Sequence, residues 1–327
     1  MHLGDPGLRV VAVLAIALLS WLNYLGVRQA SAVQVVLTAI KVLALVLIIA
    51  VACYHIARHG VVSATGQAVG ATAAPTPRAF VLALIAGLFA FGGWHMVSYA
   101  ADETVDPTRT IPRALLIGTL TVTALYVGVN AAYLFVLPVH TVASSTRVAA
   151  DFADAAIGGS GGEIMAVLVI LSTLGAMNGV ILAGPRVYLA MANDGVLFRW
   201  AGAVHPVYRT PHRAIVLQAV WSSVLVVTGT YRALFTRVVY TEWIFFGLLA
   251  AALFPLRRRS DYLPSYRVWG YPLLPALFVL SSAGIVINQI IHEPADSAWG
   301  LGLVLAGLPV YYFWARQNRI PTRRSGS

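Results

Sequence analysis

The chain has 327 residues, of which 59% are hydrophobic and only 10% charged, and its mean hydropathy is +0.80. Soluble domains average about a quarter charged residues, so this composition excludes a soluble enzyme and leaves no room for a separate soluble domain. The formal net charge of +10 comes from arginines in short loops between apolar stretches, which argues against a nucleic-acid-binding domain.

Long apolar stretches follow one another from one end of the chain to the other, many of them of about 18 residues or more, as needed to cross a bilayer. They are continuous rather than alternating, so we predict membrane-spanning helices rather than a β-barrel. The sequence therefore predicts an all-α, polytopic protein in a lipid bilayer, with about nine transmembrane helices at roughly 8–26, 33–57, 79–101, 113–137, 163–191, 213–230, 236–256, 271–291 and 298–315.

The arginines divide unevenly between the two faces that these spans define. One face receives 15 arginines and the other 6, and the positive-inside rule puts the richer face in the cytoplasm. The basic tail 316–327 is then cytoplasmic and the N-terminus lies outside. An outward N-terminus is more naturally explained by further helices upstream. The single cysteine, Cys53, permits no internal disulfide.

The only lysine of the chain, Lys41, lies inside the apolar stretch 33–57. It is about 12 Å along the helix from the start of that stretch, and a cation at such depth costs about 2.5–3.5 kcal/mol or more. Snorkelling of the side chain to the interface is one explanation. The depth favours the other, in which Lys41 faces a polar cavity or partner.

Glu242 is the matching acid, because it lies inside the stretch 236–256 whereas the other acidic residues lie in loops or at span ends. It is less than two turns from a span end, so partial hydration and a functional role both remain open. Lys41 and Glu242 enter from opposite faces, and the sequence does not indicate whether they meet.

The third span, 79–101, is interrupted at its centre by two adjacent glycines flanked by aromatic residues. Each glycine weakens a helix by about 1 kcal/mol relative to alanine, and the broken helices of transporters present free backbone groups to a substrate near the bilayer midplane. Close helix packing through glycine is the alternative. We predict a substrate site formed by Phe89, Phe91, Gly92, Gly93, Trp94 and His95.

Other polar positions give weaker indications. Tyr126, Asn130 and Tyr133 form one stripe of the fourth span, which either lines a cavity or bonds a neighbouring helix. The run of glycines and one serine at 158–162 is interpreted as a flexible outer loop. The chain has no phosphate-binding glycine loop and no Cys/His pair at zinc spacing, so neither an enzyme, a cofactor nor a metal site is predicted. In the fifth span, three polar side chains can reach a cavity: Ser172, Thr173 and Asn178.

Several motifs, in order along the chain, resemble the L-type amino acid transporter (LAT) family of the amino acid–polyamine–organocation (APC) superfamily. The number and order of these motifs make the resemblance specific. They include Asn23-Tyr24-Leu25-Gly26-Val27, Thr38-Ala39-Ile40-Lys41, Phe89-Ala90-Phe91-Gly92-Gly93-Trp94, Asp106-Pro107-Thr108-Arg109-Thr110-Ile111-Pro112-Arg113, Ser172-Thr173-Leu174-Gly175-Ala176-Met177-Asn178-Gly179 and His205-Pro206 with Arg209-Thr210-Pro211.

The resemblance implies a LeuT-like fold of about twelve helices with a five-plus-five inverted repeat. Residues 1–57 would be the last two helices of the first repeat, 79–256 the second repeat with its first helix broken at 92–93, and 271–315 the two C-terminal helices. The first three helices would be lacking. Among them is the family's other broken helix, whose amides bind the substrate carboxylate, so half of the expected site would be absent.

The resemblance also implies roles at the broken helix. Gly92 and Gly93 would expose carbonyls that accept the substrate ammonium group. Phe89 would be the outer gate, with Phe91 and Trp94 as pocket walls. His95 stands where the family commonly has Asn, so substrate specificity does not carry over.

For coupling, the resemblance puts Lys41 where sodium-coupled relatives bind a cation, near Ser172 and Thr173. A fixed positive charge there makes sodium unnecessary, or the lysine carries a proton. Glu242 stands where relatives often have a neutral residue, which leaves acid-linked coupling open. The oligomeric state is not indicated.

Together these features predict a sodium-independent amino acid permease or exchanger of the plasma membrane that works by alternating access and is incomplete as given. Two alternatives stay open. One is a non-transporting membrane fragment from a split or mis-started gene, and the other is a transporter-like amino acid sensor.

Overall fold

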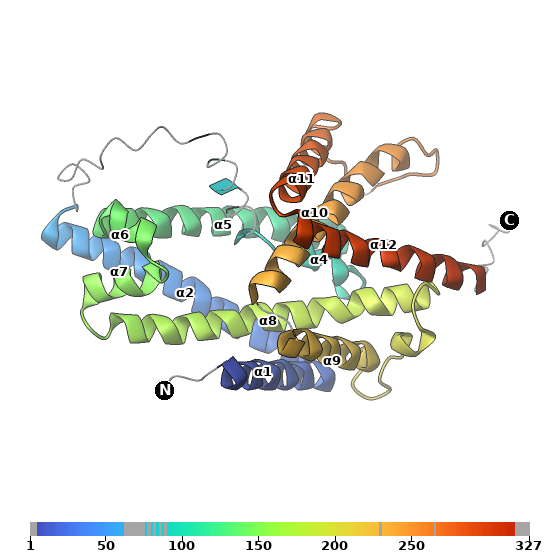
Figure 1. Cartoon of the computed structure of the whole chain (residues 1–327), viewed down its shortest axis with the longest axis horizontal. Helices are drawn as coiled ribbons and strands as arrows, with labels where there is room; N and C mark the ends of the chain where they lie inside the picture. The colour runs from blue at the N-terminus through green and yellow to red at the C-terminus, as the bar shows by residue number, and fades with distance from the viewer. Residues whose placement is uncertain are drawn as a thin grey trace. The chain divides into compact units, whose positions relative to one another are not determined.

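The computed structural model describes residues 5–61, 76, 80, 83–84, 87, 90–228, 231–264 and 266–317. Within these residues all regular secondary structure is helical (Figure 1). The elements are α1 (Asp5–Leu25), α2 (Val27–His59), α4 (Met96–Tyr99), η1 (Ala101–Glu103), α5 (Pro107–Val136), α6 (Val139–Ser144), α7 (Val148–Ile157), α8 (Gly161–Asn193), η2 (Arg199–Gly202), α9 (His212–Thr228), α10 (Tyr231–Leu256), α11 (Leu273–His292) and α12 (Pro294–Gln317).

Eight of the nine predicted spans correspond to described helices. Five of these helices, α1, α2, α5, α8 and α11, are long and apolar enough to cross a membrane, and shorter apolar helices lie within α9, α10 and α12. The start of α5 differs from the predicted span 113–137: the helix begins at Pro107 and includes Pro112. Proline is well tolerated in the first helical position, because its missing N–H needs no partner there. In the remaining predicted span, 79–101, the structure describes residues 80, 83–84, 87 and 90–101.

Large apolar side chains are exposed along the long helices, as expected of surfaces that face lipid. Val35 on α2 is 68% exposed, Leu120 on α5 is 62% exposed and Leu249 on α10 is 66% exposed. Water would make such surfaces costly, whereas hydrocarbon accepts them at no cost. The exposed faces therefore agree with the membrane spans predicted from composition.

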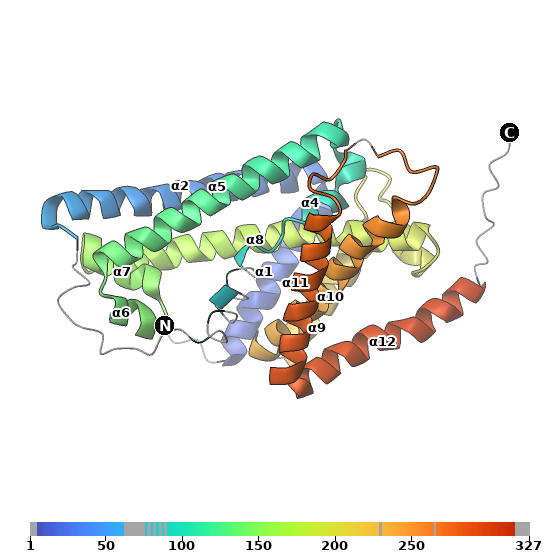
Figure 2. The same ribbon diagram turned by 90° about the horizontal axis from the view of Figure 1, so that it is seen from above.

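The chain divides into two compact units. The N-terminal unit consists of Ala17–Pro185 with His205–Thr210. In it, α2 and α5 run side by side along most of their length (Figure 2). The loop His205–Thr210 closes the C-terminal end of α1, where the buried Thr210 hydroxyl donates to the carbonyl of Tyr24 over 2.9 Å. The Tyr24 ring also packs edge-on against His205 and Tyr208.

Two short helices, α6 and α7, fill the segment between α5 and α8, where the sequence predicts no helix. Phe152 of α7 is 1% exposed because it inserts between α2 and α5. Burial of an aromatic side chain of this size stabilises by about 1.5–3 kcal/mol. The core around it is apolar and contains Ile48, Ala52, Val129, Ala132, Val136 and Met165.

The loop predicted at 158–162 is shorter in the structure, where only residues 158–160 separate α7 from α8. Gly161 begins α8, and a side chain there would collide with the backbone of Ala153. The Asp154 carboxylate accepts a 2.7 Å hydrogen bond from the Gly162 N–H and so satisfies one free donor at the start of α8. The glycines are thus used for a tight turn between α7 and α8.

The C-terminal unit contains residues 1–16, 186–204 and 211–327. Its best-packed pair is α10 and α11, which lie against each other (Figures 1 and 2). Gly247 of α10 faces the buried Ser282 of α11, so two small residues bring the helices close together. The guanidinium of Arg257 lies 4.0 Å from the centre of the Tyr271 ring at the end of this pair.

Candidate substrate-binding site

The backbone departs from helical geometry at the glycine pair. Residues 91–95 form turns, and α4 begins only at Met96. Gly93 has φ +99°, a conformation that residues with a side chain rarely adopt. The Met96 N–H donates to the Gly93 carbonyl, three residues back rather than four. Peptide groups in this segment are therefore released from the regular helical ladder.

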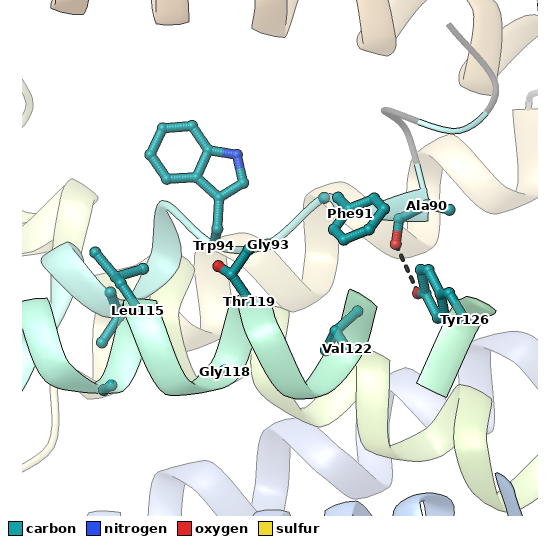
Figure 3. Close-up of a pocket in the computed structure, with 12 residues that line it drawn as sticks. Ala90, Phe91, Gly93, Trp94, Leu115, Gly118, Thr119, Val122 and Tyr126 are labelled. Carbon is teal, nitrogen blue, oxygen red and sulfur yellow. Dashed lines mark hydrogen bonds between the residues drawn. The ribbon is translucent and has the colours of Figure 1, made fainter. Parts of the chain in front are cut away.

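A cavity of about 280 Å³ lies between this opened segment and α5 (Figure 3). The opened segment contributes apolar and aromatic side chains together with its backbone. The α5 helix contributes one face. All twelve lining residues are uncharged: Ala90, Phe91, Gly92, Gly93, Trp94 and Val97 on one side, and Ala114, Leu115, Gly118, Thr119, Val122 and Tyr126 on the other.

Tyr126 fixes the point at which the chain enters the opened segment. Its hydroxyl donates a 2.8 Å hydrogen bond to the carbonyl of Ala90, and its ring packs edge-on against Phe91 with centroids 5.1 Å apart (Figure 3). The three residues of the predicted stripe, Tyr126, Asn130 and Tyr133, therefore make different contacts. Asn130 donates to the Tyr126 carbonyl within α5, while the ring of Tyr133 packs against Phe152.

The other predicted site residues of this segment lie at different depths. Trp94 is 42% exposed and lines the cavity, as do Gly92 and Gly93. His95 is buried next to it, edge-on to Trp94 and Tyr99, and is not among the lining residues. Phe89, the predicted gate, lies outside the described residues.

Asn178 lies in a buried polar network that joins α8 to α1 and α2. Its amide nitrogen donates to the Ala30 carbonyl over 3.2 Å and to Gln34 Oε1 over 2.9 Å. Its side-chain oxygen accepts a 3.0 Å bond from Asn23. Asn178 is 0% exposed, so its hydrogen bonds are made without competition from solvent. The structure thus gives Asn178 a role in helix packing, away from the lining of the cavity.

Small residues of α8 contact α2 one helical turn before Lys41. Gly179 lies against Gln34, and a Cβ on Gly175 would lie 3.1 Å from the Cβ of Leu37. Lys41 follows Leu37 by one turn of α2 and is half-buried. Thr173 is exposed and donates its hydroxyl proton to the Val169 carbonyl of its own helix.

Glu242 belongs to α10 in the C-terminal unit, where its side chain is half-buried. Lys41 belongs to the N-terminal unit. The question whether the two charges interact is therefore still a matter of prediction.

Comparison with known proteins identifies the family. A family described as amino acid permease matches residues 5–312, nearly the whole chain. The chain belongs to the amino acid permease family.

Individual relatives agree with this membership. The chain is 31% identical over 319 residues to the large neutral amino acids transporter small subunit 2 of Oryctolagus cuniculus, covering 96% of the chain and 59% of the relative. It is 30% identical over 311 residues to the Asc-type amino acid transporter 1 of Mus musculus, covering 94% and 58%. For the serine/threonine exchanger SteT of Bacillus subtilis the identity is 29% over 308 residues, covering 93% and 69%.

These matches confirm the resemblance to L-type transporters of the APC superfamily. The chain is thus a multi-pass membrane protein, and all regular secondary structure in the part that the structure describes is helical. It spans about three fifths of the length of the first two relatives.

The sequence analysis missed most of the α5 side of the cavity. Tyr126 was predicted as a candidate lining residue, whereas Gly118, Thr119 and Val122 were not. A signal was present, because Ala114, Gly118, Val122 and Tyr126 recur every four residues and so share one helical face. Asn23 and Gln34, the partners of Asn178, were also missed as polar groups.

Proposed function

We propose that the chain forms the larger part of a sodium-independent amino acid permease or exchanger that works by alternating access. The observation that carries this proposal is the cavity at the opened segment 91–95, which combines released backbone groups with uncharged walls. Transporters place substrates at such interrupted helices near the bilayer midplane.

The chemistry of the cavity suits the amino acid backbone. Carbonyl oxygens around Gly92 and Gly93 would accept hydrogen bonds from the substrate ammonium group, because a cation is well bound by several aligned carbonyl dipoles. Phe91 and Trp94 would cover the substrate side chain. The centroids of the His95 and Trp94 rings lie 5.8 Å apart, so His95 would act on the substrate indirectly, through Trp94. Phe89 would gate the outer entrance.

The proposed arrangement of spans rests on the resemblance to the LeuT-like fold. Nine spans would comprise the last two helices of the first inverted repeat (1–57), the whole second repeat (79–256) and two C-terminal helices (271–315). Amides that bind the substrate carboxylate would come from helices supplied upstream. The C-terminal tail would lie in the cytoplasm and the permease in the plasma membrane, in line with the excess of arginines on that face.

Coupling would depend on the fixed charges inside the spans. Lys41, which the resemblance puts near Ser172 and Thr173, would stand in for the bound cation of sodium-coupled relatives and tie α2 to α8. Asn178 would hold the same two helices together one to two turns away. Glu242 would carry any proton-linked component, since a carboxyl group in an apolar span is readily kept neutral and then releases its proton when water enters.

The test is exchange in proteoliposomes. Vesicles preloaded with unlabelled amino acids are given a labelled amino acid mixture, with and without sodium. The 327-residue chain is compared with the same chain extended upstream by three membrane spans. We expect exchange by the extended form, at equal rates in sodium and in choline.

The possible results separate the alternatives. Exchange that requires sodium would refute the proposed role of Lys41. Exchange by the short chain alone would show that the upstream helices do not supply half of the site. Absence of exchange by both forms would refute the transport proposal and favour a sensor or a non-transporting fragment.

A further inference from the structure

Two histidines near the end of α2 face each other. His55 and His59 are four residues apart, so their side chains share one face of the helix. The centroids of the two rings lie 4.7 Å apart, and the ring planes are tilted by 39°. His59 is exposed, whereas His55 is partly buried. The proposed transport function uses neither side chain.

A ring nitrogen of His55 has no partner within the described fold. Other histidines use theirs: His205 Nδ1 accepts hydrogen bonds from backbone N–H groups of its own loop, and His292 Nδ1 lies 2.8 Å from the carbonyl oxygen one turn before it. The Nδ1 atom of His55 is buried, and it has no hydrogen-bond partner among the residues that the structure describes. A buried nitrogen without a partner is costly, so a bound ion that engages this ring would be favourable.

The spacing of the two rings suits a shared metal ion. Two histidines four residues apart on one helical face hold the zinc ion of metalloproteases. Zinc–nitrogen bonds are about 2.0–2.1 Å long, so two nitrogens bound to one tetrahedral zinc ion lie about 3.3 Å apart. Rings with centroids 4.7 Å apart reach this separation by small side-chain rotations. Imidazole binds zinc, copper and nickel well, whereas magnesium and calcium prefer oxygen ligands.

The position of the pair also favours a cation. With 33 residues, α2 is about 50 Å long and exceeds the hydrocarbon core of about 30 Å, so its last turns extend into the headgroup region or water. The uneven division of arginines puts this end on the outer face. The C-terminal end of a helix is its negative end. The guanidinium of Arg58, which would repel a metal ion, lies over the Tyr54 ring at 5.4 Å, on a neighbouring face of the helix.

We propose that His55 and His59 form a binding site for a divalent transition-metal ion such as Zn²⁺ at the outer end of α2. No cluster of three or more His, Cys, Asp or Glu residues occurs in the part of the chain that the structure describes, and residues 60–78 contain none of these residue types. Water would complete the coordination shell, which favours an exchangeable ion over a structural one. The pattern differs from the cysteine–histidine pair whose absence led to the prediction of no metal site. The inference does not depend on the proposed function.

The test is a Zn²⁺ titration of the purified 327-residue chain, prepared without a histidine tag. Binding is followed by competition with a chromogenic zinc chelator, and the midpoint of thermal unfolding is measured in parallel. We expect one ion per chain and a higher midpoint in Zn²⁺, because a ligand of the folded state stabilises that state. For His55→Ala and for His59→Ala we expect the Zn²⁺ affinity to fall by roughly tenfold or more, since even the loss of an outer partner of a metal ligand costs about 10–100-fold.

The matched control is His292→Ala, which removes an exposed histidine from the end of α11, where Asn288 stands four residues earlier. We expect its Zn²⁺ affinity to equal that of the unchanged chain. Absence of Zn²⁺ binding by the unchanged chain would overturn the inference, as would unchanged affinity in either histidine variant with an unchanged metal-free midpoint. If His55→Ala lowers the metal-free midpoint, His59→Ala decides, because the His59 side chain is exposed and its removal should leave the fold intact.

Discussion

At the residue scale, the site depends on where peptide groups are released from the helix. Gly93 accepts a φ of +99° that would strain any other residue, and Tyr126 holds the preceding carbonyl of Ala90 at 2.8 Å. The opened segment is therefore fixed on one side by backbone conformation and on the other by a hydrogen bond from α5. An uncharged cavity beside backbone groups released from the helical ladder is suited to a substrate that carries its own charges on its backbone.

The replacement Gly93→Ala tests the conformational part of this account. A methyl group meets no atom at this position, so any effect comes from the backbone, where strain of about 1–3 kcal/mol is expected. We expect a lower midpoint in fluorescence-detected thermal unfolding and loss of exchange. Gly118→Ala is the control for stability, because it adds the same methyl group in a helical conformation and should not lower the midpoint. Equal midpoints for both variants would show that the positive φ of Gly93 is dispensable.

At the element scale, two kinds of contact hold the long helices of the N-terminal unit together. Small residues such as Gly128 and Gly175 let backbones approach, and the Asn178 amide adds hydrogen bonds to Ala30 and Gln34. Apolar surface alone gives little preference for one neighbouring helix over lipid, so these specific contacts decide which helices pair. Lys41 lies on the same surface of α2, one turn beyond Leu37.

Replacement of Asn178 by alanine removes the centre of the polar network. Because Asn23 and Gln34 lose a buried partner, we expect a loss of about 1–3 kcal/mol in stability, seen as a lower unfolding midpoint in detergent. Thr173→Ala serves as the control, since the exposed Thr173 hydroxyl donates to the Val169 carbonyl of its own helix. A midpoint for Asn178→Ala equal to that of the control would contradict a packing role.

Lys41→Ala separates coupling from packing. Removal of a cation from an apolar span relieves an insertion cost of about 2.5–3.5 kcal/mol or more, so we expect near-normal expression and an unchanged elution profile in size-exclusion chromatography. Exchange should be abolished. If the variant instead aggregates or fails to express, Lys41 is a structural residue and the proposed coupling role is wrong.

At the scale of the whole molecule, the sequence predicted the elements that hydropathy governs. A stretch such as 163–191 is long and apolar, and α8 occupies it almost residue for residue. The short helices α6 and α7 were missed because six and ten residues are too few for a strong periodic signal, and Phe152 gains its burial only from α2 and α5. Their fold depends on contacts that are distant in sequence.

Only one side of the candidate site could be predicted from the sequence, because hydropathy does not mark the other side. The glycine pair at 92–93 is visible because it interrupts an apolar span. The facing residues Gly118 and Val122 are apolar whether they face lipid or a cavity, so hydropathy does not distinguish the two environments. Only the approach of the opened segment to α5 identifies them.

Protection of a thiol at position 118 tests most directly whether amino acids bind between the opened segment and α5. In a Cys53→Ser background, which has no other cysteine, Gly118→Cys is labelled with a thiol reagent in the presence and absence of amino acids, with Ala124→Cys as the matched exposed position on the same helix. The account predicts that amino acids slow labelling at position 118 and leave labelling at 124 unchanged, in the chain extended upstream. Equal labelling rates at position 118 with and without amino acids would contradict a substrate site in this cavity.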